Sequence, residues 1–215
     1  MSELIIACLS QKGGVGKSTL ARLIAQTYAS AGWDVKIADF NTRQKTAVDW
    51  VQTRDAEGVQ PVIQAEPYLS PKNLRKENAD LVVVDGRPDS DQSSLEIARM
   101  ATLNVLPTGL TIDDLKPQLL FAYELLQKGV HASQIMFVLN KTGDSDLAVE
   151  EARNYLSTSG LYVAAQDLST KVGYQMAQNT GRSVAETKYG TLNDKAITLA
   201  AQIVDRVNAL TKEAA

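Results

Sequence analysis

Cysteine and histidine are nearly missing from this sequence, which has one of each in 215 residues. With Cys8 alone, an intramolecular disulfide is excluded, and a cysteine-ligated iron–sulfur cluster would need ligands from other chains. Cys8 lies in the apolar run of residues 4–9, so we expect it to fill the core. His131 follows Gly129, a predicted helix end, and we expect it in a surface loop.

Long hydrophobic runs are also absent. No apolar stretch approaches the roughly 20 residues that span a bilayer, and the first residues lack the basic-then-apolar order of a signal peptide. We therefore expect a cytoplasmic protein without membrane contact. The content of 44% hydrophobic and 22% charged residues is ordinary for a globular chain. We expect one domain over residues 1–215, without a repeat or a linker.

No strong charge of one sign marks the chain, whose net charge is −3. From residue 171 onward, six basic residues stand against four acidic ones, an excess of +2. This excess is far below the basic density of a dedicated nucleic-acid domain, and a solvated helical face is its simplest explanation. Residues 171–215 are therefore only a basic-leaning region.

Short β-branched runs alternate along the chain with longer stretches of helical periodicity. Several runs are apolar on both faces, which is typical of a parallel sheet covered by helices on both sides. The alternation predicts an α/β fold with a doubly wound, mainly parallel sheet and helices on both faces. The predicted strands occupy residues 4–9, 34–38, 61–65, 81–84, 103–106, 134–139 and 161–164, with helices between them.

Two of the predicted helices have a recurrent apolar face that we expect to be buried. After the first strand this face consists of Leu20, Leu23, Ile24, Thr27 and Tyr28. After Pro107 it consists of Leu115, Leu119, Leu120, Tyr123 and Leu126. Gly129 is a natural end for the second helix. The alanine-rich stretch at residues 192–215 carries mixed charges and predicts a packed terminal helix.

A glycine-rich stretch carries the clearest chemical signal. Residues 10–21 read SQKGGVGKSTLA, which nearly matches G-x-x-x-x-G-K-[ST], with Gln11 at the place of the first glycine. It follows the first predicted strand and opens a helix, so its backbone N–H groups and the helix N-terminus would bind phosphates. Lys17 would neutralise the β- and γ-phosphates, and the Ser18 hydroxyl would ligate Mg²⁺. The predicted nucleotide contacts are Gly13, Gly14, Val15, Gly16, Lys17, Ser18 and Thr19.

Two aspartates end predicted strands at the same edge of the sheet. Asp85 closes the apolar run LVVV, and Asp39 closes the run VKIA. Ligands of open α/β sheets collect at this carboxyl edge, where a carboxylate holds the magnesium shell through water. We therefore predict a metal site from Ser18, Asp39 and Asp85. The alternative for each aspartate is that it caps the turn that follows.

The string K-G-G-V-G-K-S, with the extra lysine Lys12 in front, resembles the deviant Walker A motif of the ParA/MinD family of ATPases, and the resemblance extends over nearly the whole chain. It implies a P-loop ATPase that uses ATP and Mg²⁺. In this family the extra lysine crosses a dimer interface to the partner's nucleotide, so the resemblance implies an ATP-induced homodimer. It also implies that Lys12, Lys17 and Asp39 are catalytic residues.

Within the family the chain is similar to short plasmid-partition ParA proteins of the ParF-like type, because its phosphate loop begins a few residues after Met1. This similarity implies a cytoplasmic, nucleoid-associated protein that binds nonspecific DNA. Hydrolysis stimulated by a ParB-like centromere-binding or adaptor protein would release the DNA. By match of position, the DNA contacts would be Lys171 and Arg182, followed by Lys188 and Lys195.

Two asparagines complete the predicted site. Asn140 ends a strand and matches a position that lies near the adenine in relatives, although an Asn is also common at such a turn. The stretch NKTGD has Gly143 where a guanine-specific box needs Asp, so guanine selectivity is not expected. Asn41 stands where relatives have a second Asp that supports hydrolysis. Since an amide cannot accept a proton, we expect slow intrinsic turnover.

Other functions remain open on the sequence. A ParA-like positioner of another cargo, such as a protein cluster or a mobile element, would have the same motifs. A membrane-cycling MinD-like ATPase would end in a basic amphipathic helix, whereas we expect the alanine-rich residues 192–215 to form a packed helix. A small-molecule kinase or ligase would have no use for Lys12. A reductase of the nitrogenase iron-protein type would need more cysteines than Cys8.

Overall fold

The computed structural model describes residues 4–88 and 92–213. Its centre is a sheet with the strand order β3-β2-β4-β1-β5-β6-β7, and β8 pairs with β6 beside this path. Every pairing among the described strands is parallel. The strands are β1 (Leu4–Ser10), β2 (Val35–Asp39), β3 (Gln64–Pro67), β4 (Leu81–Pro88), β5 (Leu103–Thr108), β6 (Ile135–Thr142), β7 (Tyr162–Val163) and β8 (Leu168–Ser169).

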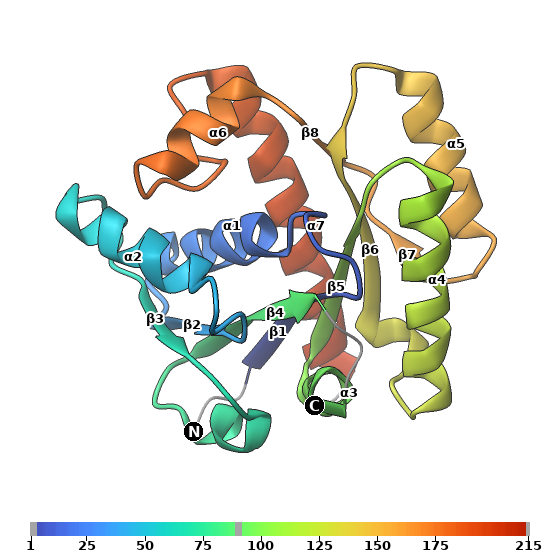
Figure 1. Ribbon diagram of the computed structural model, residues 1–215, viewed down its shortest axis with the longest axis horizontal. Helices are drawn as coiled ribbons and strands as arrows, with labels where there is room; N and C mark the ends of the chain where they lie inside the picture. The colour runs from blue at the N-terminus through green and yellow to red at the C-terminus, as the bar shows by residue number, and fades with distance from the viewer. Residues whose placement is uncertain (1–3, 89–91, 214–215) are drawn as a thin grey trace.

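Helices cover both faces of this sheet in a single-domain α/β fold, which confirms the predicted fold class (Figure 1). One layer contains α1 (Lys17–Ser30), α2 (Thr46–Ala56), α6 (Val172–Asn179) and α7 (Gly190–Glu213). The opposite layer contains α3 (Gln92–Met100), α4 (Ile112–Gln127), α5 (Asp146–Ser157) and the 3-10 helix η1 (Pro71–Lys76). A second 3-10 helix, η2 (Ala132–Gln134), leads into β6.

Strand β1 shows why a covered parallel strand is apolar throughout. Successive side chains point to opposite faces, so Ile6 and Cys8 enter one core layer while Ile5 and Leu9 enter the other. All of its residues are buried. Cys8 is fully buried, which confirms it as a core residue.

The prediction was wrong between the second and fourth strands. Strand β3 begins at Gln64, three residues later than predicted, because Pro61 has no N–H to donate to a sheet. No α-helix follows β3. Pro67 ends β3, and the segment after it forms only η1, with Pro71 at its first position, where a helix tolerates proline. The two-residue strand β8 gave no signal in the sequence.

The predicted buried face was largely confirmed for α1 and was partly wrong for α4. The apolar face of α1 is buried as predicted, apart from Thr27, which is half-buried. In α4, Leu120 and Tyr123 are exposed, which contradicts the predicted face. The buried side is formed by Leu115, Gln118, Phe121, Ala122 and Leu125. Apolar residues occupy so much of the circumference of α4 that periodicity alone does not identify the packed side.

The C-terminal helix α7 packs on the sheet as predicted. Its buried residues are Ala196, Leu199, Ala200, Ile203 and Val207. Among the residues that the structure describes, no helix combines the length and the apolar character that crossing a bilayer requires.

Candidate nucleotide site

Buried polar residues gather where the central strands end. Asp39 ends β2, Asp85 lies near the end of β4, and Ser10 ends β1 between them and β5. From β1 the chain continues to β2, which lies toward one edge of the sheet, whereas β5 lies on the opposite side of β1. Such a switch point leaves a crevice at the carboxyl edge, where ligands of doubly wound sheets bind.

The phosphate loop leaves β1 in this crevice and needs its glycines. Gly14 has φ 80° and Gly16 has φ 100°, a left-handed conformation that side chains with a Cβ rarely adopt. At Gly16 a Cβ would also lie 1.8 Å from Nδ2 of Asn140. Gly16 is the N-cap of α1, so the loop delivers backbone N–H groups at a helix N-terminus.

Asn140 braces this loop from the neighbouring side of the sheet. Its buried Nδ2 donates to the carbonyl of Val15 over 2.9 Å. It also lines a cavity of about 120 Å³, together with Thr19 at the start of α1 and Tyr174 and Gln178 on α6. The predicted position of Asn140 near a base therefore stays a prediction, while its contact with the loop is a role that the sequence did not indicate.

Lys17 lies below the loop and is 7% exposed. Its Nζ donates to the main-chain carbonyl of Lys12 over 2.9 Å, so the loop closes on its own lysine. Burial lowers the pKa of Lys17, and the carboxylate of Asp85 partly offsets this effect.

Ser18, Thr46 and Asp85 form a polar chain beside Lys17. The hydroxyl oxygens of Ser18 and Thr46 are 3.2 Å apart, and Oγ1 of Thr46 donates to Oδ2 of Asp85 over 3.4 Å. Burial raises the pKa of Asp85 to about 6, although hydrogen bonding by Ser18 acts in the opposite direction. The fold thus brings together Ser18 and Asp85, two of the predicted metal ligands.

The third predicted ligand, Asp39, already has partners for both of its oxygens. Oδ1 accepts from the backbone N–H of Asn41 over 2.9 Å. Oδ2 accepts from the N–H groups of Ala47 and Val48, over 2.8 Å and 3.4 Å, in the first turn of α2. Burial raises the pKa of Asp39, and these three bonds oppose the rise. The turn-capping alternative is therefore present, and a metal or catalytic role of Asp39 stays a prediction.

No group of three or more His, Cys, Asp or Glu side chains among the described residues is arranged to hold a metal ion. A magnesium ion here would take most of its ligands from phosphate oxygens and water, as Mg²⁺ commonly does at nucleotide sites. The hydroxyl of Ser18 and the carboxylate of Asp85 are suited to orient such an ion.

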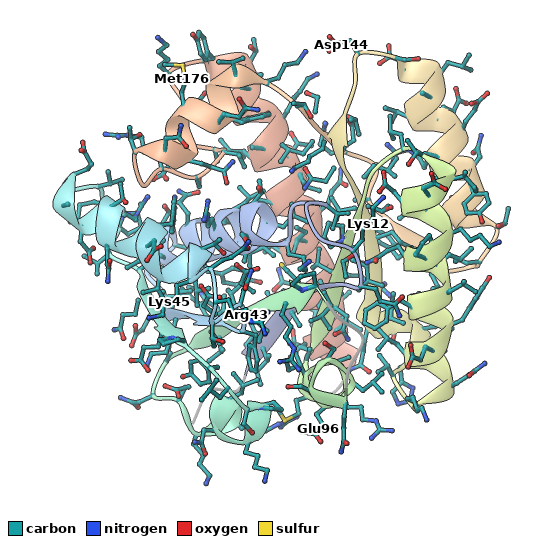
Figure 2. All side chains as sticks on the ribbon, in the orientation of Figure 1. Lys12, Arg43, Lys45, Glu96, Asp144 and Met176 are labelled. Carbon is teal, nitrogen blue, oxygen red and sulfur yellow. The ribbon has the colours of Figure 1, made fainter. Side chains whose placement is uncertain are left out.

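Arg22, which the sequence analysis missed, ties this site to its surroundings. Arg22 donates from Nη2 to the carbonyl of Thr46 over 2.7 Å and from Nη1 to Oε1 of Gln178 over 3.1 Å. Arg22 follows Ser18 by about one helical turn, so the spacing alone places both on one face of α1. Arg43 and Lys45, in the loop before α2, are exposed (Figure 2).

The extra lysine lies on the other side of the loop, facing α4 (Figure 2). The Lys12 side chain is 45% exposed, and its Nζ forms an ion pair with Asp114 in the first turn of α4. The nearby residue Ser10 also contacts this helix, because it donates from Oγ to Oε1 of Gln118 over 2.8 Å. The two loop lysines therefore differ in burial and in partner.

The four predicted DNA contacts come from different elements. Lys171 is the N-cap of α6 and forms an ion pair with Asp144. Arg182 lies beyond the other end of α6, about 12 Å away for a helix of this length. The chain then returns along α6, so that Tyr189, the residue after Lys188, lies beside Gly173. Lys195 is exposed on α7.

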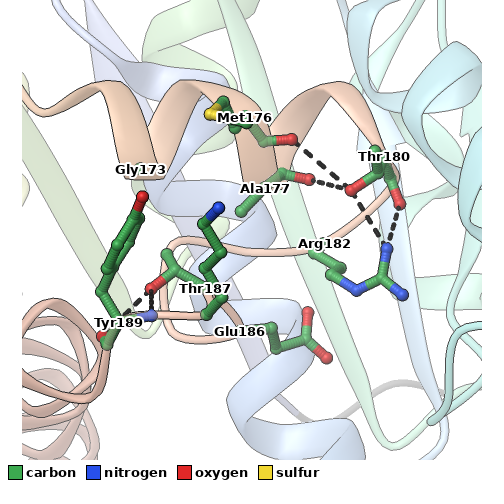
Figure 3. Close-up of a pocket in the computed structure, with 9 residues that line it drawn as sticks. Gly173, Met176, Ala177, Thr180, Arg182, Glu186, Thr187 and Tyr189 are labelled. Carbon is green, nitrogen blue, oxygen red and sulfur yellow. Dashed lines mark hydrogen bonds between the residues drawn. The ribbon is translucent and has the colours of Figure 1, made fainter.

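Arg182 and Lys188 line an open cavity of about 380 Å³ (Figure 3). Its apolar part includes the exposed side chains of Met176 on α6 and Tyr189. Arg182 turns toward Thr180 and donates from Nη1 to Oγ1 of that residue over 3.1 Å. The cavity along α6 thus combines two cations with an apolar surface.

A buried ion pair anchors the segment that carries this cavity. Arg54 on α2 has no exposed surface, and its two terminal nitrogens reach the two carboxylate oxygens of Glu186 over 2.8 Å and 3.0 Å. Arg54 also donates to the carbonyl of Gly181 over 2.9 Å. Arg54 thus fixes α2, which begins at Thr46 beside Asp85, to the segment that carries Arg182 and Lys188.

Residues 6–210 match the sequence model of the CobQ/CobB/MinD/ParA nucleotide binding domain. No curated protein matches the sequence significantly.

Several solved structures share the fold. Septum site-determining protein MinD of Pyrococcus horikoshii OT3, complexed with Mg-ADP, has a TM-score of 0.71 and 16% identity, covering 94% of this chain and 96% of that chain. Apo McdA of Cyanothece has a TM-score of 0.68 and 14% identity, covering 93% of this chain and 99% of that chain. A ParA family ATPase of Chlorobium tepidum TLS has a TM-score of 0.67 and 13% identity, covering 93% of this chain and 99% of that chain.

Other similar structures contain AMPPNP or ATP, and one is a complex of MinC with MinD from Aquifex aeolicus. Nucleotide thus occurs repeatedly in structures of this fold, once with magnesium.

Proposed function

This chain belongs to the CobQ/CobB/MinD/ParA nucleotide binding domain family, and from that premise we propose that it is a Mg²⁺-dependent ATPase of the ParA type that dimerises on ATP and then binds DNA without sequence preference. The observation that carries the proposal is the pair of lysines on one loop. Lys17 is buried below the loop, as nucleotide binding requires, whereas Lys12 is half-exposed on its outer side. Binding of one nucleotide by one chain needs only Lys17.

The residues at the crevice fit a magnesium triphosphate. Gly14 and Gly16 have left-handed conformations, of the kind that lets successive backbone N–H groups converge on an anion. Lys17 would bind phosphate oxygens, and Ser18 with Asp85 would hold the ion. Magnesium, when bound, supplies charge neutralisation at the phosphate oxygens.

The chain's own residues set what is ready for hydrolysis and what must change. Lys17 uses one of its three donors on the carbonyl of Lys12, which leaves two for phosphate oxygens. Asp39 accepts two backbone N–H groups of the first turn of α2 at Oδ2, and movement of this turn would free that oxygen to orient a water. Because Asn41 cannot accept a proton in its place, hydrolysis would be slow until a partner, such as a ParB-like adaptor, moves this segment.

Dimerisation gives the primary test. Sedimentation velocity of the purified chain with AMPPNP, with ADP and without nucleotide should show a dimer only with AMPPNP. Lys12→Ala should remain monomeric throughout, since an ammonium from each subunit offsets the charge of two facing triphosphates. A wild-type chain that stays monomeric with AMPPNP would reject the proposed function.

DNA binding would use the cations around α6. They are few, but a dimer doubles their number, and two weak sites held together raise avidity without new contacts. Contacts to backbone phosphates are independent of sequence and weaken with salt. Such binding would make the protein nucleoid-associated.

The DNA test compares matched charge removals in the AMPPNP state. Arg182→Gln/Lys188→Gln should weaken binding to random duplex DNA and lower the salt slope by about one for each cation that binds a phosphate in the wild type. Lys72→Gln/Lys76→Gln removes two exposed charges from η1 and should change neither the affinity nor the salt slope. Equal affinity for DNA with AMPPNP, with ADP and without nucleotide would reject nucleotide-gated binding.

Other cargoes fit the same cycle, since the McdA and MinD structures share the fold. A membrane-cycling function is less well supported. Leu199, Ile203 and Val207 of α7 are buried against the sheet and cannot also insert into a bilayer.

A further inference from the structure

Lys12 is not free to extend from its loop. Its Nζ contacts the carboxylate of Asp114 and the backbone carbonyl of Asp113, the latter over 3.4 Å. The side chain of Lys12 is 45% exposed and that of Asp114 is 19% exposed. The cation that would reach another subunit is therefore paired inside its own chain.

The position of Asp114 is fixed before Lys12 arrives. Thr111, the N-cap of α4, donates from Oγ1 to Oδ2 of Asp114 over 2.9 Å, and the N–H of Asp114 donates to the carbonyl of Thr111 over 2.9 Å. A Cβ at Gly109 would lie 2.3 Å from Oδ2, so the chain passes close to the carboxylate. The carboxylate keeps Oδ1 for Lys12.

Asp114 is also held in its charged form. Partial burial acts to raise the pKa of its carboxyl group, but the Lys12 ammonium and the Thr111 hydroxyl outweigh burial and lower the pKa. Asp113, the preceding residue, is exposed and shares the helix N-terminus, but only its main chain contacts Lys12.

An open cavity of about 360 Å³ lies beside the ion pair. It is lined by loop residues Gly13 and Gly14 on one side and by Thr111 and Asp114 on the other. Lys12 thus lies where the phosphate loop faces the outside of the molecule, and rotation of its flexible side chain would be enough to leave Asp114.

We propose that Asp114 is a positioning residue that holds Lys12 inside its own subunit and thereby sets how readily two subunits dimerise. This inference rests on the proposed function, in which Lys12 moves to the nucleotide of a second copy of the chain. Lys12 leaves Asp114 only for a site of greater negative charge, such as a triphosphate in a closed interface from which water is excluded. Each dimer breaks two Lys12–Asp114 pairs.

The test measures the dimer dissociation constant with AMPPNP by sedimentation equilibrium. Asp114→Asn keeps the shape of the side chain and its bond to Thr111 but removes the charge. We expect this variant to dimerise with a dissociation constant about three- to tenfold lower, because partly exposed ion pairs are weak and two are no longer broken. Asp113→Asn removes the same charge one residue earlier and should match the wild type.

Two further measurements show that the effect passes through Lys12. In Lys12→Ala/Asp114→Asn the gain should vanish, and this double variant should stay monomeric with AMPPNP, as Lys12→Ala does. The difference between Asp114→Asn and the wild type should shrink in 1 M salt, because salt screens an exposed pair, whereas a change in helix packing would persist. Asp114→Ser, which still suits the first turn of a helix, is the second variant if Asp114→Asn folds poorly.

The outcomes separate the two proposals. A wild-type chain that dimerises with AMPPNP while Asp114→Asn dimerises equally or more weakly would overturn the role of Asp114 alone. A wild-type chain that does not dimerise would overturn the proposed function and this inference together. A gain that Asp113→Asn reproduces, or that persists without Lys12, would also overturn the role of Asp114.

Discussion

The ammonium group of Lys17 donates a hydrogen bond of 2.9 Å to the backbone carbonyl of Lys12, so the two lysines of the phosphate loop are joined through the main chain. Lys12 in turn directs its side chain to Asp114 on α4. One residue therefore contributes its carbonyl to the inner side of the loop and its charge to the outer side. The two lysines can for this reason be tested separately.

The two lysine substitutions should differ in their effect on nucleotide binding by the monomer. Lys17→Ala should weaken binding of Mg·ATP by about 10- to 100-fold, because it removes a charge-assisted contact to phosphate. Lys12→Ala keeps the backbone carbonyl, so its dissociation constant for Mg·ATP should stay within about threefold of the wild-type value. Isothermal titration at protein concentrations below the dimer dissociation constant measures both. Equal losses in the two variants would contradict the assigned division of roles.

Restoring a carboxylate at position 41 should speed hydrolysis. Asn41 now donates from Nδ2 to Oε1 of Gln44 over 2.8 Å and is held in the loop before α2. Asn41→Asp supplies an acceptor for a proton and should raise steady-state ATPase activity by at least about tenfold. Gln44→Ala also removes this loop bond, but it adds no carboxylate and should leave the rate near that of the wild type. Identical rates for Asn41→Asp and the wild type would count against the hypothesis.

Removing the partner of Arg54 should destabilise the fold. Glu186→Ala leaves a fully buried guanidinium with carbonyl acceptors only, and we expect the free energy of unfolding to fall by about 3 kcal/mol. Glu150→Ala, on an exposed position of α5, should change it by less than about 0.5 kcal/mol. Urea unfolding followed by circular dichroism gives both values. A loss as small as that of the control would mean that Arg54 is satisfied without Glu186.

Asp85 should lower the stability of the chain when no ligand is bound. Its pKa is raised from 3.8 to about 6 in the folded state by burial, so the folded chain binds the proton more tightly than the unfolded chain. Wild-type stability should therefore fall as the pH rises from about 4 to about 6 and then level off.

Asp85→Asn carries no charge at any pH and should escape this loss. In EDTA and without nucleotide, its free energy of unfolding should exceed that of the wild type by about 1–3 kcal/mol at about pH 7.5, and the difference should shrink toward about pH 4. The same variant should bind Mg·ATP more weakly, because the site loses a carboxylate. An unchanged or lower stability near neutral pH would contradict the inferred cost of the buried charge.

Local chemistry made much of the site predictable. The glycines, Lys17 and Ser18 are contiguous in sequence, and a loop between a strand and a helix fixes their geometry wherever it occurs. Asp85 was predictable because it follows an apolar strand at the carboxyl edge of the sheet. The predicted helix face of α4 was wrong at Leu120 and Tyr123, since the packed side depends on which neighbour covers it.

The sequence by itself determined the parallel α/β fold, the buried place of Cys8 and the phosphate loop, because these follow from periodicity and from adjacent residues. Only the tertiary structure decided that Asp39 caps α2, that Asn140 braces the loop, that Lys171 is separated from Arg182 by the length of α6, and that Lys12 is held by Asp114. Lys12 and Asp114 are 102 positions apart. No local pattern indicates such a contact, since it exists only after the sheet has placed β1 beside β5 and α4 next to the loop.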